Sequence, residues 1–275
     1  MKINLTRYPG NIYKNLLPRD VWVWVPPQYH VETKQRFPVI FMHDGQNLFY
    51  PEKAYTQITW GVAEAITRLS GWGFIQPAIV VGIDNTDNRI GDYMPTRPFE
   101  TPAGKAYLDR IREETEGQFD QNVYMADDYL EWMTTILKPQ IDKDFRTRPG
   151  PQHTLIMGSS MGGLISLYAL LEYPEVFGGA GCFSTHWPPL GNLIQPYLRK
   201  YLPAPGRHRI YFDLGTGGGD AIYPPYQQVV DQVMAEKGYS PGRDWITRVA
   251  PGAEHHESAW RRRFHIALRF FLGRV

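Results

Sequence analysis

The stretch 153–173 constrains the fold of this chain more than any other part of the sequence. It begins with a short apolar run, Thr154 to Met157, whose length and composition are those of a buried strand. Gly158-Ser159-Ser160-Met161-Gly162 follows and matches the pattern G-x-S-x-G. Apolar residues then recur at helical spacing as far as Pro174. A strand, a sharp turn and a helix in this order predict that the Ser160 hydroxyl projects from a strained turn.

Small residues are needed around Ser160, because strand and helix lie close together at such a turn. Gly158, Gly162 and Gly163 meet this need. The amide of Met161 is expected at the helix N-terminus, where donors lack helical acceptors and the dipole favours negative charge. We therefore predict Ser160 as a nucleophile and Met161 as one oxyanion donor. The alternative is a glycine-rich turn with a serine that has no role.

A polar loop follows another apolar run, Phe37 to Met42. The loop reads His43-Asp44-Gly45-Gln46-Asn47-Leu48-Phe49. Serine hydrolases of this architecture place a second oxyanion donor in the loop after an early central strand, and we assign it to the amide of Gln46. A polar turn that caps the next segment is the alternative. His43 precedes the loop and is interpreted as a hydrogen-bonded structural histidine.

A serine hydroxyl needs a base that accepts its proton and a group that orients the base. In this architecture the nucleophile, the acid and the histidine follow one another along the chain. His255 and His256 lie in the loop after the last predicted strand. We choose His255 as the base, because the helix that follows takes His256 into its first turn.

Two aspartates compete for the role of the acid. Asp213 lies within a predicted strand, so its side chain can point into the sheet. Asp220 lies in the glycine-rich loop after that strand, and this loop can fold back toward His255. We favour Asp220, with an N-cap of the next helix as its alternative role.

Two further loops follow predicted strands, on the side where α/β sheets bind ligands. One contains Arg89 and Tyr93, and the other contains His186 and Trp187. These four residues are candidates for contacts with the substrate. The alternative for Arg89 and Tyr93 is a solvated loop residue without a role in binding.

Strands alternate with helices along the chain, which predicts an α/β fold with a mostly parallel central sheet and helices on both faces. The strands are expected at 20–25, 37–42, 76–83, 154–157, 178–183, 209–214 and 245–249, and the helices at 59–69, 127–145, 164–173, 190–201, 223–237 and 257–272. No linker separates two cores, so residues 1–275 are predicted to form one domain. Residues 94–123 break the alternation and are interpreted as a lid or pocket wall, or as a surface elaboration. Pro139 is expected to kink the helix 127–145.

Composition argues against several classes of function. The net charge is +1 and no basic stripe is present, which argues against a nucleic-acid partner. No apolar run approaches about 18 residues, so no membrane partner is expected, and the absence of an apolar N-terminal segment makes a cytoplasmic location the default. The single cysteine, Cys182, excludes an internal disulfide. His256-Glu257 begins like a zinc motif, but Trp260 replaces its second histidine, and no glycine pattern for phosphate is complete, so neither metal nor cofactor is expected.

Three motifs together resemble the Putative esterase family: the elbow 158–163, the loop 43–49, and His255-x-Glu257-x-x-Trp260. This family includes enterochelin esterases, feruloyl and acetyl-xylan esterases of carbohydrate esterase family one, and mycolyltransferases. The resemblance runs from about residue 21 to about residue 263. It implies an α/β-hydrolase fold, hydrolysis of carboxylic esters, Ser160 and His255 as the catalytic pair, and the amides of Gln46 and Met161 as oxyanion donors.

The resemblance says least about the acid, since some members place it differently or use a dyad. The expected substrate is a small-molecule or carbohydrate-linked ester. Two alternatives use the same scaffold, an acyltransferase and a non-catalytic binding protein. The sequence does not indicate an oligomeric state.

Overall fold

The computed structural model describes residues 5–115 and 124–274. An eight-stranded sheet forms the centre, in the order β1-β2-β4-β3-β5-β6-β7-β8. The strands are β1 (Leu5–Asn11), β2 (Arg19–Trp24), β3 (Val39–His43), β4 (Ile79–Ile83), β5 (Thr154–Ser159), β6 (Gly179–Phe183), β7 (Arg209–Gly215) and β8 (Trp245–Ala250). The pairs β1–β2 and β2–β4 are antiparallel, and the pairs from β4 to β8 are parallel. The predicted, mostly parallel sheet is therefore confirmed.

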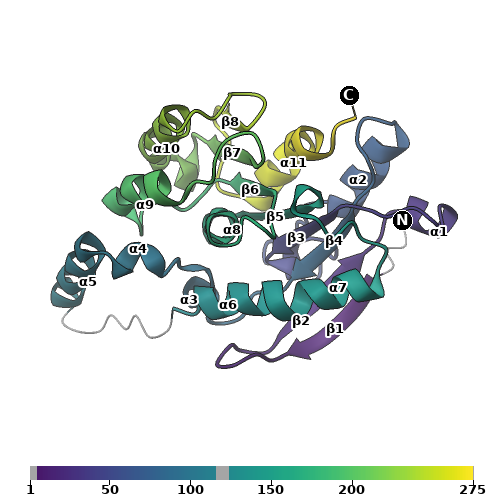
Figure 1. The fold of residues 1–275 in the computed structure, drawn as a ribbon, viewed down its shortest axis with the longest axis horizontal. Helices are drawn as coiled ribbons and strands as arrows, with labels where there is room; N and C mark the ends of the chain where they lie inside the picture. The colour runs from purple at the N-terminus through teal and green to yellow at the C-terminus, as the bar shows by residue number, and fades with distance from the viewer. Residues whose placement is uncertain (1–4, 116–123, 275) are drawn as a thin grey trace.

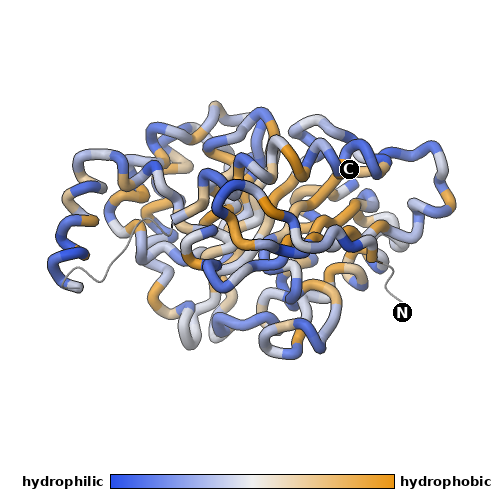
Figure 2. The backbone as a smooth tube through the Cα atoms, turned by 90° about the horizontal axis from the view of Figure 1, so that it is seen from below, coloured by the Kyte–Doolittle hydropathy of each residue, from blue (hydrophilic) through white to orange (hydrophobic). Residues whose placement is uncertain are grey.

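The central strands are apolar on both faces. In β3, Val39 and Phe41 pack into one core, whereas Ile40 and Met42 pack into another on the opposite face, because successive side chains alternate across a strand. Both faces must therefore be covered by helices. Figure 2 shows the hydrophobic part of the backbone concentrated in the middle of the molecule.

Helices cover both faces of this sheet (Figure 1). One core lies beneath α2 (Val62–Gly71) and α11 (Glu257–Leu272). The other lies beneath α6 (Ala126–Trp132), α7 (Lys138–Asp144), α8 (Met161–Glu172), α9 (Ile194–Tyr201) and α10 (Pro224–Glu236). Within the described ranges, no helix combines the length and the hydrophobicity needed to cross a bilayer.

The predicted irregularity near Pro139 takes the form of a π-helical turn, Met133–Leu137, between α6 and α7. Proline has no amide hydrogen, and its ring crowds the carbonyl one turn earlier, so the regular hydrogen-bond ladder cannot continue unchanged. The helix continues through this turn and ends at Asp144.

The sequence patterns missed the edge strand β1 and the short helix α1 (Gln28–Val31). Strand β1 reads LTRYPGN, and its residues are only partly buried or exposed. It lacks the alternating apolar residues that indicate a strand, and its pairing with β2 forms it instead.

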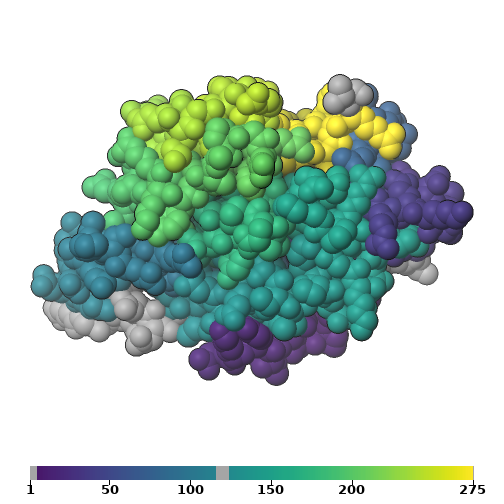
Figure 3. Space-filling model, viewed as in Figure 1, coloured from purple at the N-terminus to yellow at the C-terminus, as the bar shows by residue number. Residues whose placement is uncertain are grey.

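The described part of the segment 94–123, residues 94–115, is largely helical although it breaks the alternation of strands and helices. It follows α3 (Arg89–Tyr93) and contains α4 (Arg97–Glu100) and α5 (Pro102–Glu114). Pro98 and Pro102 occupy the first turns of α4 and α5, where a backbone N–H needs no helical partner. These prolines therefore begin the two helices. These helices stand at one end of the molecule (Figure 3).

Candidate active site

The turn after β5 holds Ser160 in a conformation that non-glycine residues seldom adopt, with φ 58° and ψ −122°. The neighbouring glycines allow strand and helix to approach. A Cβ on Gly158 would lie 2.7 Å from the backbone of Gly162, and one on Gly163 would lie 3.1 Å from Oγ1 of Thr185. The strand–turn–helix arrangement and the need for these glycines agree with the sequence prediction.

Ser160 lines a cavity of about 470 Å³. His255 reaches the same cavity from the loop between β8 and α11. Gln46 and Arg89 reach it from loops that follow β3 and β4. The carboxyl ends of the parallel strands thus bring together loops that are far apart in the sequence.

Asp220 contacts the imidazole of His255, with 2.6 Å between Oδ1 and Nδ1. Its other oxygen accepts hydrogen bonds from the amide of Gly215 and from Oγ of Ser184, both at 2.6 Å. Burial would raise the pKa of Asp220, but the hydrogen bonds from His255, Ser184 and Gly215 lower it below the usual value. An ionised carboxylate at Nδ1 requires the imidazole proton there, which leaves Nε2 to accept a proton from the serine.

Asp213, the other candidate acid, has a different partner. Arg263 donates to both of its oxygens at 3.0 Å, and the Tyr211 hydroxyl donates to one of them at 3.0 Å. The side chains of Arg263 and Asp213 are only 8% and 0% exposed. Asp213 therefore belongs to a buried ion pair beneath the site, whereas Asp220 contacts His255.

The two candidate oxyanion donors are backbone amides in the first turns of helices. Met161 is the first residue of α8, and Gln46 lies in the 3-10 helix η1 (Gly45–Asn47). Neither amide donates a hydrogen bond within the part of the chain that the structure describes. Their role as oxyanion donors stays a prediction.

Arg89 lines the cavity and also anchors the loop that carries Gln46. Its guanidinium binds both oxygens of Asp44, at 2.7 and 2.8 Å. Burial would raise the pKa of Asp44, but Arg89 and a 2.6 Å hydrogen bond from Asn85 lower it. Asp44 is therefore ionised, and the pair holds it in a left-handed conformation.

The structure does not place the other three pocket candidates in this cavity. Tyr93 is fully buried, and its hydroxyl accepts a hydrogen bond from the amide of Asp44. Trp187 is buried beneath the surface and donates to Gln227 at 3.3 Å. The prediction of substrate contacts was wrong for these two aromatic residues, because they fill the core. His186 lies beside Ser160, and its amide donates to the Ser160 carbonyl oxygen at 3.1 Å.

His43 is buried as interpreted, with Nδ1 2.9 Å from the hydroxyl of Tyr129. Burial lowers its pKa to about 3, so its imidazole is neutral. It does not line the cavity of Ser160.

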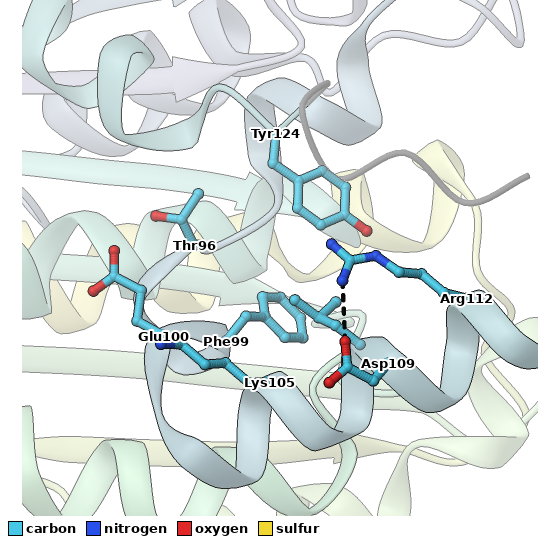
Figure 4. Close-up of a pocket in the computed structure, with 8 residues that line it drawn as sticks. Thr96, Phe99, Glu100, Lys105, Asp109, Arg112 and Tyr124 are labelled. Carbon is cyan, nitrogen blue, oxygen red and sulfur yellow. Dashed lines mark hydrogen bonds and ion pairs between the residues drawn. The ribbon is translucent and has the colours of Figure 1, made fainter. Parts of the chain in front are cut away.

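The helices α4 and α5 line a different cavity, of about 560 Å³ (Figure 4). Arg112 and Asp109 form an ion pair at its edge, 3.0 Å apart. No residue of 94–115 lines the cavity of Ser160, so the described part of the predicted pocket wall does not form one there. The start of this part contacts α8 instead, where Nε of Arg97 lies 2.8 Å from a carboxylate oxygen of Glu172. The same prediction for residues 116–123 lies outside the described residues.

Sequence reasoning missed Ser184 and Tyr223. Ser184 follows β6, has a φ of 42°, and donates to Asp220. Tyr223 follows the glycine-rich loop after β7 and lies against His255. The only available signal was their position in segments that leave the carboxyl edge of the sheet, Ser184 directly after β6 and Tyr223 at the end of the loop after β7.

The sheet order, the elbow at Ser160 and the contact between His255 and Asp220 define the class of protein as an α/β-hydrolase. Solved structures share this fold. A ferulic acid esterase superposes with a TM-score of 0.68 at 17% identity and covers 99% of both chains. The enterobactin esterase FES from Shigella flexneri superposes with a TM-score of 0.70 at 18% identity and covers 98% of this chain and 58% of its own.

The family follows from the sequence. The model of the "Putative esterase" family matches residues 17–271, so the chain belongs to this family and is an esterase. It is 24% identical over 263 residues to "Uncharacterized protein YbbA" from Bacillus subtilis (strain 168), with 93% of each chain covered. It is 27% identical over 158 residues to "Ferri-bacillibactin esterase BesA" of the same organism, which covers 55% of this chain and 49% of that protein. The predicted fold and family are confirmed.

Proposed function

We propose that this esterase hydrolyses carboxylic esters through an acyl-enzyme on Ser160. Nε2 of His255 accepts the serine proton as Oγ attacks the ester carbonyl carbon, and Asp220 stabilises the imidazolium. The amides of Met161 and Gln46 stabilise the oxyanion. The imidazolium then protonates the leaving alcohol, and a water molecule activated by His255 releases the acid and restores Ser160.

One observation supports this proposal most strongly. Nδ1 of His255 lies 2.6 Å from an Asp220 carboxylate, while His255 and the strained Ser160 line one cavity. A base that is oriented by an ionised carboxylate and faces a nucleophile on a tight turn is the arrangement that acyl transfer requires.

The substrate is proposed to be a small-molecule or carbohydrate-linked ester. The cavity of about 470 Å³ has the volume of a small-ligand site. Related proteins named for enterobactin, ferri-bacillibactin and ferulic acid support this class. Turnover of a panel of esters, in which the acyl part and the alcohol part are varied one at a time, identifies the ester that this cavity accepts.

The first test is the release of nitrophenol from a short-chain nitrophenyl ester. We expect Ser160→Ala to lower kcat by about 10⁴- to 10⁶-fold and Asp220→Asn by about 10²- to 10⁴-fold, because the first removes the nucleophile and the second the ionised partner of His255. Ser166→Ala is the matched control, since this buried serine on the same helix donates only to the Gly162 carbonyl oxygen. Wild-type turnover in Ser160→Ala would exclude the proposal.

A further inference from the structure

A tyrosine–histidine pair lies beside the nucleophile and does not line its cavity. The hydroxyl of Tyr223 is 2.8 Å from Nδ1 of His186. The amide of His186 donates to the carbonyl oxygen of Ser160, which ties this pair to the elbow. The ring of Tyr223 packs edge-on against both His186 and His255, with centroids 5.9 and 5.7 Å away. Tyr223 thus contacts both histidines next to Ser160.

The Tyr223 hydroxyl also lies close enough to the Ser160 side chain for the two groups to interact, and this interaction works to lower the pKa of Tyr223. Within the described residues, no hydrogen bond joins Ser160 to His255. The resting serine hydroxyl therefore lies beside the tyrosine and must turn toward His255 before it can react. Such reorientation is common, because catalytic hydrogen bonds often form only when substrate is bound.

The protonation states of Tyr223 and His186 determine which role this pair can have. Burial and the nearby Asp220 raise the pKa of Tyr223 to about 12, so its hydroxyl keeps its proton. Partial burial lowers the pKa of His186, and the charges of His255 and Arg89 lower it further, so its imidazole is neutral. Neither residue is suited to be a second base, and the pair is suited to direct a hydrogen bond.

The acyl-enzyme determines the direction of that hydrogen bond. Once Oγ of Ser160 is acylated it has no hydrogen and can only accept, so in a hydrogen bond between the two groups the Tyr223 hydroxyl is the donor. The hydroxyl has a single hydrogen, and Nδ1 of His186 must then donate to the phenol oxygen. A neutral His186 with its proton on Nδ1 meets this condition.

We propose that Tyr223 is a further catalytic residue, which donates a hydrogen bond to Oγ of Ser160 when this atom leaves the acyl group, and that His186 is the positioning residue that directs it. In deacylation, water loses a proton to His255 and attacks the acyl carbon. The bond from this carbon to Oγ then breaks, its electron pair goes to Oγ, and Oγ takes the proton from His255. Tyr223 keeps its own proton and stabilises the negative charge that develops on Oγ. This inference rests on the proposed acyl-enzyme on Ser160.

Stopped-flow measurement with a nitrophenyl ester separates the two steps, because the burst reports acylation and the steady state reports deacylation. We expect Tyr223→Phe to slow deacylation about tenfold, as for the loss of one hydrogen bond in the transition state, and to change acylation less than about threefold. Tyr226→Phe on α10 is the matched control, since Tyr226 lines a different cavity from Ser160.

Variants of His186 test whether it acts through Tyr223. His186→Ala is expected to slow deacylation as Tyr223→Phe does, and the double variant to be no slower than Tyr223→Phe alone. His186→Asn is expected to restore most of the rate, because its amide nitrogen can take the place of Nδ1.

Two failures are distinguishable in this experiment. If Ser160→Ala abolishes the burst but Tyr223→Phe deacylates at the wild-type rate, the role of Tyr223 is overturned and the proposed function stands. If Ser160→Ala retains the burst, the proposed function fails, and the role of Tyr223 fails with it.

Discussion

Ser160, Asp44 and Ser184 share a positive φ, of 58°, 55° and 42°. Such conformations cost about 1–3 kcal/mol each in non-glycine residues and persist only where the surroundings hold them. Ser184 is held by Trp260, whose Nε1 donates to its hydroxyl at 2.9 Å, and Asp44 is held by Arg89. Backbone strain is thus found in the loops that carry the candidate site.

Asp84 is a residue at which one substitution should stabilise the protein at neutral pH. Burial raises its pKa to about 6, and the charge of Asp20 adds to this effect. Its Oδ1 has no hydrogen-bond partner among the described residues, while Trp22 donates to Oδ2 at 3.0 Å. Because the pKa is higher in the folded state, folding favours the protonated acid. The contribution of this protonated acid to the free energy of unfolding is complete below about pH 4, and it is lost as the pH rises through 6.

We expect Asp84→Asn to raise the free energy of unfolding at pH 7 by about 1–2 kcal/mol and to flatten its pH dependence between about pH 4 and 6. Urea unfolding at several pH values measures both effects. Asp87→Asn is the control, because this exposed residue lies in the same loop. A lower stability of Asp84→Asn at pH 7 would contradict the prediction.

At the scale of elements, α5 shows how capping and proline start a helix in a segment with weak apolar periodicity. The Thr101 side chain accepts from the amide of Gly104 at 3.0 Å, and Pro102 follows at the first helical position. The helix buries only Gly104 and Leu108. Its first turn therefore contributes much of what stabilises it.

Thr101→Ala should destabilise α5 by about 1 kcal/mol, because one amide at the helix start loses its acceptor. Amide hydrogen exchange within residues 102–114 measures this change locally. Thr115→Ala is the matched control, since Thr115 caps the other end of the same helix and its hydroxyl bonds back to the carbonyl oxygens of Ile111 and Arg112. Equal effects of the two substitutions would argue against the cap. Ester turnover should not change, because α5 does not line the cavity of Ser160.

At the scale of the whole molecule, the C-terminal helix α11 supports Asp220, the candidate acid, through two intermediate residues. Arg263 on α11 pairs with Asp213 on β7 and also donates to the Ser184 hydroxyl at 3.2 Å. Ser184 in turn donates to Asp220. Helix, sheet and site loops therefore meet in one buried polar network, and such networks are costly to leave half paired.

Arg263→Met should lower the free energy of unfolding by about 3–5 kcal/mol, because it leaves Asp213 buried without its partner. Arg199→Met is the control. Arg199 also binds a carboxylate through two nitrogens, but this pair with Glu236 has side chains 46% and 39% exposed and should contribute at most about 1 kcal/mol. Urea unfolding compares the two variants. Similar losses would show that burial of the Arg263 pair does not matter.

Local patterns predicted the parts of this protein in which neighbouring residues determine the structure. The elbow at Ser160 depends on adjacent glycines, an apolar strand and a helical repeat, and all of these are contiguous in the sequence. The alternation of strands and helices predicted the sheet for the same reason. The edge strand β1 could not be predicted in this way, because its partner β2 supplies the hydrogen bonds that form it.

The sequence by itself determined the fold class, the turn that presents Ser160 and the loop that contains His255. The local pattern favoured Asp220, which lies in a loop, over Asp213, which lies in a strand. Only the tertiary structure showed that Asp220 contacts that histidine while Asp213 pairs with Arg263. It also decided that Tyr93 and Trp187 are buried while Tyr223 contacts the site. The physical reason is that burial and hydrogen-bond partners depend on residues from distant strands and helices, which a short stretch of sequence does not contain.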